Sequence, residues 1–239
     1  MTMQAAMVGT NGIVLASDTK WQFTAQRGNL QTRHTSGSSK ILVSEERGIA
    51  IACAKSMETA DLIADTILGK LSATDWTYPG CAMEAIAQGV IDTIADERRF
   101  FQCLVATARP SVRLFQIETV TLNGVPNRAM CHQIIDKAIS GDNANAAAFW
   151  AERYYRKSQP AESLIPLAAQ VIVDASKLNS GFVGGLEIVV CDERGPRRLS
   201  DDENSAYEAQ AERRSAQIAE MFSADTNTAV PFRTAQPQG

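Results

Sequence analysis

The first chemistry that this sequence offers lies at its second residue, Thr2. Aminopeptidase removes the initiator Met1 before a small residue, so the mature chain would begin with a threonine that carries a free α-amine and a hydroxyl. The pKa of an α-amine is about 7.7 to 8.0, so a good fraction is neutral at physiological pH and accepts a proton from the hydroxyl. Threonine activated by its own amine is a known form of covalent catalysis. The plain alternative, that Thr2 simply follows Met1, stays open.

Other residue types narrow the choice of base. Only two histidines, His34 and His132, occur in 239 residues, so a histidine triad or a metal site has few groups to draw on. We therefore expect no metal ion and no cofactor. The net charge of −4 predicts no contact with nucleic acid. Five cysteines form no CxxC pair, and we find neither a signal peptide nor a long apolar span. We expect a cytoplasmic protein with reduced thiols and no membrane contact.

The elements that position Thr2 begin almost at the first residue. Two apolar runs, Met3 to Val8 and Ile13 to Ala16, flank Thr10-Asn11-Gly12. Asn-Gly between such runs is the strongest short-range signal for a β-hairpin. Chain termini usually fray unless a sheet holds them, so this hairpin would give Thr2 a defined place.

The rest of the chain alternates between strand and helix periods. After a loop or irregular hairpin over 21–39, the pattern predicts strands at 40–44 and 48–53, helices at 56–71 and 81–100, strands at 101–107, 112–119 and 132–139, helices at 144–155 and 163–178, and a strand at 186–191. This order suggests an α+β protein built as a four-layered αββα sandwich. Residues 2–199 would form one domain, 200–223 a C-terminal helix and 224–239 a disordered tail.

Two further motifs follow Thr2 in order. Val14-Leu15-Ala16-Ser17-Asp18 ends the hairpin, and Lys40 opens a strand in Ser38-Ser39-Lys40-Ile41-Leu42. With these motifs the chain resembles proteasome β-subunits and HslV-type bacterial peptidases, which are N-terminal nucleophile hydrolases, and it could belong to a divergent bacterial proteasome-like group. The separation of Thr2 and Asp18 matches the spacing of that family between nucleophile and aspartate.

The resemblance implies a role for each matched residue. Thr2 would attack a peptide carbonyl, Lys40 would place a positive charge near its hydroxyl, and Asp18 would balance Lys40. Ser140 would open the third helix and hydrogen-bond the α-amine, although a serine there also suits a plain N-cap. Taken alone, Asp18 suits a turn and Lys40 a solvated strand end. The backbone N–H of Ala54 would bind the oxyanion.

One part of the family pattern is missing. Counting back from Gly184-Gly185 places Ser180 and Val183 where the family has an aspartate and a serine, so the aspartate that polarises the amine is absent. By resemblance, four residues would surround the substrate side chain that precedes the cut, namely Trp21, Ser38, Ala52 and Ser56.

The implied function is a threonine endopeptidase of a self-compartmentalising complex. By resemblance we expect a homo-oligomeric double ring that cleaves unfolded polypeptides or peptides, with an ATPase unfoldase as a partner. An inactive ring subunit of the same fold, or an amide hydrolase of the same superfamily that acts on a small molecule, are the alternatives.

Overall fold

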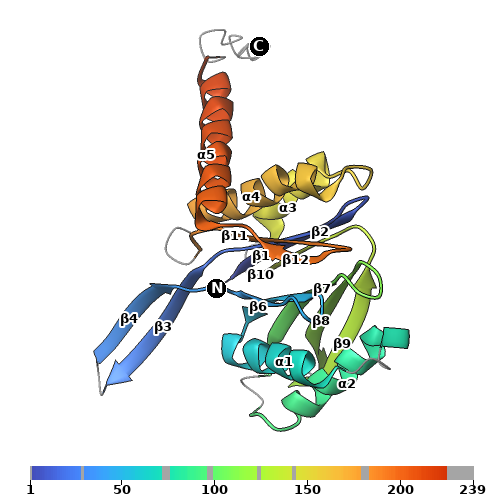
Figure 1. Ribbon diagram of the computed structural model, residues 1–239. Helices are drawn as coiled ribbons and strands as arrows, with labels where there is room; N and C mark the ends of the chain where they lie inside the picture. Colours follow the sequence, from blue (N-terminus) through green and yellow to red (C-terminus); the bar gives the residue numbers. More distant parts are fainter. Residues whose placement is uncertain are drawn as a thin grey trace, which may run out of the picture.

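The computed structural model describes residues 2–27, 30–71, 76–95, 99–122, 125–141, 144–178 and 183–224. In these residues the chain forms two five-stranded antiparallel sheets, a separate two-stranded hairpin and five helices. The α+β class is therefore confirmed. The hairpin of β3 (Lys20–Arg27) and β4 (Leu30–Gly37) projects from the body of the molecule (Figure 1).

The first sheet has the strand order β10-β1-β2-β11-β12. Its strands are β10 (Lys137–Gly141), β1 (Met3–Val8), β2 (Gly12–Ser17), β11 (Glu187–Asp192) and β12 (Gly195–Arg198). The predicted turn joins β1 and β2, where the Gly9 N–H donates to the Gly12 carbonyl. The Asn11 side chain accepts a hydrogen bond from the Ala161 N–H of the following helix layer. The first hairpin is thus held on both sides, which gives the N-terminus a fixed position.

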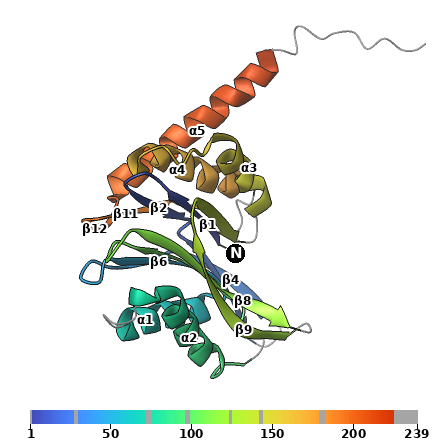
Figure 2. The same cartoon turned by 90° about the vertical axis from the view of Figure 1, so that its right-hand side faces the viewer.

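The second sheet has the order β5-β6-β7-β8-β9. Its strands are β5 (Ile41–Ser44), β6 (Ile49–Lys55), β7 (Phe101–Thr107), β8 (Arg113–Leu122) and β9 (Val125–Ile134). Helices α1 (Met57–Lys70) and α2 (Pro79–Ile91) cover its outer face (Figure 2). Their apolar sides bury Ile63 and Met83 against Ile51 and Cys103 of the sheet.

The inner faces of the two sheets pack on each other, while α3 (Ala144–Tyr154) and α4 (Ala161–Leu178) cover the outer face of the first sheet. Side chains alternate along β1, as a pleated strand requires. Met3, Ala5 and Met7 contact the helices, whereas Ala6 belongs to the core between the sheets with Leu104 of β7. Even-numbered residues of β1 therefore face the second sheet.

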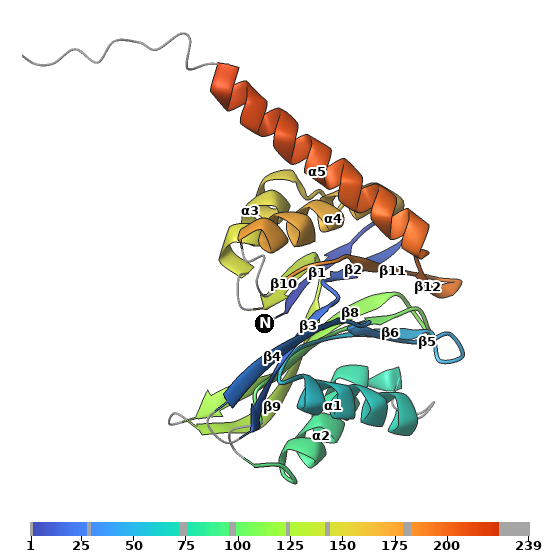
Figure 3. The same cartoon turned by 90° about the vertical axis from the view of Figure 1, so that its left-hand side faces the viewer.

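Helix α5 (Asp201–Ala224) crosses α4 and continues beyond the body of the molecule (Figure 3). Arg214 joins the two helices by donating to the Gln170 side chain and to the Pro166 carbonyl. The predicted disordered tail lies outside the described residues from residue 225 onward. None of the helices in the described part of the chain combines the length and apolar character that crossing a bilayer requires.

Three predicted elements differ from the structure by more than their last few residues. The helix expected to reach residue 100 ends at Ile91, and the N–H groups of Thr93 and Ile94 donate to the carbonyls three positions earlier. The strand expected over 132–139 is two strands separated by the turn at Ile135 and Asp136. The segment read as a loop or irregular hairpin over 21–39 forms most of the regular hairpin β3–β4.

The prediction that Ser140 opens a helix is also wrong. Ser140 lies in β10 opposite Gln4, and the next helix begins at Ala144. Ser-Gly-Asp is typical of a helix start, but pairing with β1 extends the strand through Gly141. Gly141 tolerates this course because its φ is +116°, a value that side-chain-bearing residues rarely adopt.

Candidate active site

Thr2 immediately precedes β1, at the N-terminal end of the chain that is marked N in Figure 3. It is 3% exposed. Because side chains two residues apart share a face, Thr2 and Gln4 both point toward the second sheet. The strand therefore places the Thr2 hydroxyl among polar groups at one end of an otherwise apolar inter-sheet core.

Lys40 is the cationic side chain beside Thr2. Its Nζ lies 3.3 Å from Thr2 Oγ1, 2.8 Å from Asp18 Oδ2 and 2.6 Å from the carbonyl oxygen of Lys20. An ammonium group has three N–H donors, and here three acceptors surround it. Lys40 is 1% exposed, so this geometry describes a buried ammonium that is fully hydrogen-bonded.

Asp18 supplies the counter-charge and also fixes the chain around Thr2. Its Oδ1 accepts from the Met3 N–H at 2.7 Å, and its Oδ2 accepts from the Lys20 N–H at 3.2 Å. Burial raises the pKa of Asp18, while the contact with Lys40 opposes that rise. Burial likewise lowers the pKa of Lys40 against the contact with Asp18. Burial thus disfavours both charges, and the contact between Lys40 and Asp18 opposes that effect in each group.

Glu187 and Arg198, which were not predicted from the sequence, fix the backbone at Lys40: Glu187 binds it directly and Arg198 pairs with Glu187. Glu187, at the start of β11, accepts from the Lys40 N–H at 3.0 Å and from the Ser39 hydroxyl at 2.8 Å. Its carboxylate also pairs with the guanidinium of Arg198 on β12. Glu187 is 4% exposed. A glutamate inside the apolar run Leu186 to Cys191 was the signal in the sequence, because buried carboxylates are kept only with partners.

Ser140 and Gly141 bring β10 against the start of β1. The Ser140 hydroxyl donates to Gln4 Oε1 at 3.1 Å. A Cβ placed on Gly141 would overlap the carbonyl oxygen of Thr2, so only glycine allows the two strands to approach so closely. Ser140 therefore lies next to Gln4 on the inner face of the sheet, and Thr2 lies two residues before Gln4 on the same face.

The predicted oxyanion donor, Ala54, lies near the end of β6. Along β6 the N–H groups alternate between the two neighbouring strands. The Cys53 N–H donates to the Lys40 carbonyl on the side of β5, and the Ser56 N–H donates to the Phe100 carbonyl on the side of β7. This alternation directs the Ala54 N–H toward β7 and the Lys55 N–H toward the side of Lys40. Lys55 also has a φ of +69°, a left-handed conformation that is rare for lysine.

The structure brings together Thr2, Asp18 and Lys40, and it describes three of the residues predicted to surround the substrate side chain. Ala52 is buried in the core between the sheets, and Ser56 precedes α1 with its hydroxyl on Thr59. Ser38 is exposed and lies two residues before Lys40.

Two predicted site residues fall outside what the structure describes. Ser180 lies outside the described residues. Trp21 belongs to β3, but its side chain is not among those described.

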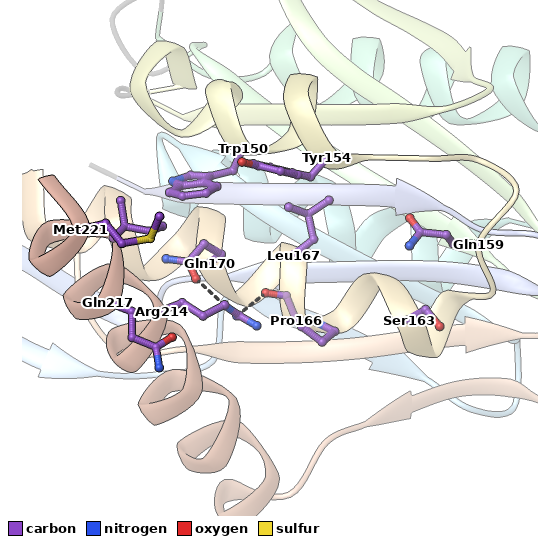
Figure 4. Close-up of a pocket in the computed structure, with 11 residues that line it drawn as sticks. Trp150, Tyr154, Gln159, Ser163, Pro166, Leu167, Gln170, Arg214, Gln217 and Met221 are labelled. Atoms are coloured by element: carbon purple, nitrogen blue, oxygen red, sulfur yellow. Dashed lines mark hydrogen bonds between the residues drawn. The ribbon is translucent and has the colours of Figure 1, made fainter. Parts of the chain in front are cut away.

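A cavity of about 550 Å³ lies elsewhere, between α3, α4 and α5 (Figure 4). Trp150 and Tyr154 stack along one wall, and Met221 of α5 contributes to the lining. None of the predicted site residues lines this cavity. It is therefore separate from the site at Thr2.

Comparison with known proteins gives a fold but no family. No family model matches the chain, and no curated protein does. Among solved structures, the chain is similar to Anbu (ancestral beta-subunit) from Yersinia bercovieri, with a TM-score of 0.71, 12% identity, and 93% of this chain and 97% of that chain covered. It is also similar to an Anbu (Gly-1) mutant from Hyphomicrobium sp. strain MC1, with a TM-score of 0.67, 15% identity, and 94% and 99% covered.

These neighbours correct the resemblance inferred from the motifs. Anbu proteins are a distinct proteasome-like family, related to the branch of proteasome β-subunits and HslV-type peptidases but separate from it. Assignment to that branch is therefore wrong. At 12% and 15% identity the likeness shows a shared fold, so the roles of individual residues rest on the geometry described above.

Proposed function

We propose that this chain is a threonine-type endopeptidase with a proteasome-like fold, active after removal of Met1. One observation carries the proposal: the buried Lys40 Nζ lies 3.3 Å from Thr2 Oγ1 while Asp18 holds its charge. Positive charge at that distance stabilises the alkoxide character that a threonine nucleophile must develop. A plain structural lysine at a strand end would more often lie in water.

The same geometry supports a role for the α-amine as the base. All three N–H groups of Lys40 have acceptors, so its ammonium has no lone pair for the Thr2 proton. In the proposed reaction Thr2 Oγ attacks the peptide carbonyl carbon and its proton moves to the α-amine. The tetrahedral intermediate then collapses, the proton passes to the leaving amine, and an ester links Thr2 to the acyl part of the substrate.

Hydrolysis of this ester completes the cycle. Water, activated by the same amine, attacks the ester carbonyl and releases the acid and the free Thr2 hydroxyl. The oxyanion formed in each step needs a backbone donor near Thr2. The strand register supports the Lys55 N–H for this role in place of Ala54, since it points toward the side of Lys40.

We further propose that the two sheets and their helices form the four-layered αββα sandwich of N-terminal nucleophile hydrolases. Residues 2–199 would be the catalytic domain and 200–223 a helical extension. The likeness to proteins whose name contains "beta-subunit" supports a homo-oligomeric ring as the working form. Enclosure in a ring would restrict access to unfolded polypeptides or peptides, delivered with or without an ATPase unfoldase.

Amino-terminal sequencing combined with a fluorogenic-peptide assay tests the proposal. Thr2→Ala and Thr2→Ser are matched variants, because both residues are small enough for Met1 removal. We expect chains that begin at residue 2, hydrolysis by wild type, weaker hydrolysis by Thr2→Ser and none by Thr2→Ala. A wild-type chain that retains Met1 would favour an inactive ring subunit. Hydrolysis that persists in Thr2→Ala would exclude Thr2 as nucleophile, and a monomer that cleaves only small amides would favour the small-molecule enzyme.

A further inference from the structure

Gln4 holds an unusual position for an amide side chain. It is fully buried on the inner face of β1, two residues after Thr2. Its Oε1 accepts from the Ser140 hydroxyl, but its Nε2 has no hydrogen-bond partner in the described part of the chain. Buried N–H donors without a partner are rare in native proteins, and less common than buried acceptors without one. Such an atom points to a hydrogen-bond arrangement that this form of the chain leaves incomplete.

The state of the Thr2 nitrogen determines which partners it can have. While Met1 of the sequence precedes it, the Thr2 nitrogen is a peptide nitrogen, which donates a hydrogen bond but has no lone pair to accept one. The Ser140 hydroxyl has no acceptor there and donates to Gln4 instead. Removal of Met1 converts the Thr2 nitrogen into an amine, whose neutral form has a lone pair.

We propose that Gln4 is a positioning residue whose amide reverses when Met1 is removed. Nε2 then donates to Ser140 Oγ, and the Ser140 hydroxyl donates to the lone pair of the Thr2 amine. Reversal needs only rotation about the terminal torsion, because amide oxygen and nitrogen occupy almost the same volume. The unpartnered donor gains an acceptor, and the cost moves to the amide oxygen, an acceptor that tolerates it better.

The pairing of β1 with β10 supports this relay. Gln4 is in register with Ser140, and Met3 with Gly141. Directly paired residues of antiparallel strands point to the same face, so Ser140 lies beside Gln4 and next along from Thr2. Ser140 and Gln4 are both at least 98% buried, so bulk water does not compete for these hydrogen bonds.

The consequence concerns the protonation of the catalytic amine, so this inference rests on the proposed function. A hydroxyl that donates to the amine lone pair favours the neutral amine and lowers its pKa. The charged groups that the structure places at the start of β1 act on the same equilibrium: Asp18 and Lys40, with Lys20 next to Asp18 and Glu187 against the Lys40 backbone. Residues 142–143, which follow Gly141, lie outside the described residues. Gln4 differs from these groups because it is neutral and acts through Ser140.

Two measurements on the Met1-free protein test the relay. The pKa of the Thr2 amine follows from the pH dependence of its acetylation by an N-hydroxysuccinimide ester, located by peptide mass mapping, because only the neutral amine reacts. The second measurement is the pH profile of kcat/KM for a fluorogenic peptide. Gln4→Met removes the donor and keeps the length, Gln4→Glu leaves only an acceptor, and Gln133→Met is the matched control on exposed β9.

We expect Gln4→Glu to raise the amine pKa by about one unit and Gln4→Met by about half a unit. Both variants should move the acid limb of kcat/KM upward by the same amounts. In a Ser140→Ala background Gln4→Met should leave the amine pKa unchanged, because its effect passes through Ser140. The urea midpoint of Gln4→Met should stay close to that of wild type, because loss of the hydrogen bond to Ser140 is offset by removal of the amide oxygen that the reversal leaves without a donor.

A purely structural Gln4 would give the opposite pattern. Gln4→Met would then lower the urea midpoint while leaving the amine pKa of wild type in place, and the relay would be refuted. An equal pKa shift by Gln4→Met with and without Ser140 would also overturn it. If wild type cleaves no peptide but the amine pKa shifts as expected, the relay stands and the proposed function fails.

Discussion

Replacement of the two buried charges, singly and together, gives a quantitative prediction about the site. Lys40→Met leaves Asp18 buried with two backbone donors, from Met3 and Lys20, but without a counter-charge. Breaking a buried ion pair on one side costs about 3–5 kcal/mol of unfolding free energy. The two remaining donors place this variant at the lower end, about 3 kcal/mol. Asp18→Asn leaves the Lys40 ammonium buried and should cost a similar amount.

The double variant Asp18→Asn/Lys40→Met carries neither charge. Buried pairs replaced by neutral groups of similar size are often neutral or stabilising. We therefore expect a loss of about 1 kcal/mol or less, compared with about 6 kcal/mol for the sum of the single variants. The coupling energy is then about 5 kcal/mol. Such a value is far above that of an exposed ion pair, which contributes about 0–1 kcal/mol.

Stability also depends on pH in a direction set by the two pKa shifts. The pKa of Asp18 is raised from 3.8 in the folded protein, so its contribution is present below that value and is lost as pH rises through the folded pKa. The pKa of Lys40 is lowered from 10.5, so its contribution is present above that value and is lost as pH falls through the folded pKa. The unfolding free energy of the double variant, taken relative to that of wild type, should therefore be highest near neutral pH and lower in acid or alkali.

Urea unfolding followed by circular dichroism measures this cycle. All four proteins are compared at one protomer concentration and in the same oligomeric state, because association adds to apparent stability. The reasoning is refuted if each single variant costs less than about 1 kcal/mol and the two effects add. That result would mean that the charges lie in water and not beside Thr2.

Three further predictions concern the surrounding backbone. Gly141→Ala should lower stability by about 1–3 kcal/mol and abolish peptide hydrolysis, because the new Cβ overlaps the Thr2 carbonyl; a stable, active variant contradicts this. Lys55→Gly should raise the urea-derived unfolding free energy by about 1 kcal/mol over Lys55→Ala, because φ is +69°; equal values would argue against that backbone conformation. Glu187→Gln should reduce kcat/KM by about 10- to 100-fold by loosening Lys40, while a fully active variant would show that Lys40 is held without it.

Local patterns in the sequence accounted for most of the scaffold. Asn11-Gly12 predicted the first hairpin, and apolar periodicity predicted the α+β order, because turn geometry and one-sided burial depend on neighbours in the chain. Thr2, Asp18 and Lys40 could be picked out by type and spacing. The branch of proteasome-like proteins could not be predicted from these motifs, because related families with the same fold share short motifs.

The missed features depend on partners far away in the sequence. Ser140 meets Gln4 across 136 residues, and Glu187 meets the Lys40 backbone across 147 residues. No periodic pattern encodes such pairs. The residues around Ser140 have the local preference of a helix start, but pairing with β1 places Ser140 in a strand. In the same way, the φ of Lys55 follows from the path between β6 and α1 and not from its residue type.

The central claim, that Thr2 acts as a nucleophile through its own hydroxyl, is tested most directly by covalent labelling. A peptidyl β-lactone opens on an activated hydroxyl and adds its whole mass as an ester, which intact mass and peptide mapping then locate. We predict one adduct on Thr2 of a chain that lacks Met1, none in Thr2→Ala, and much slower labelling in Lys40→Met. Labelling that continues in Thr2→Ala, or a native chain that keeps Met1 and takes up no label, would contradict it.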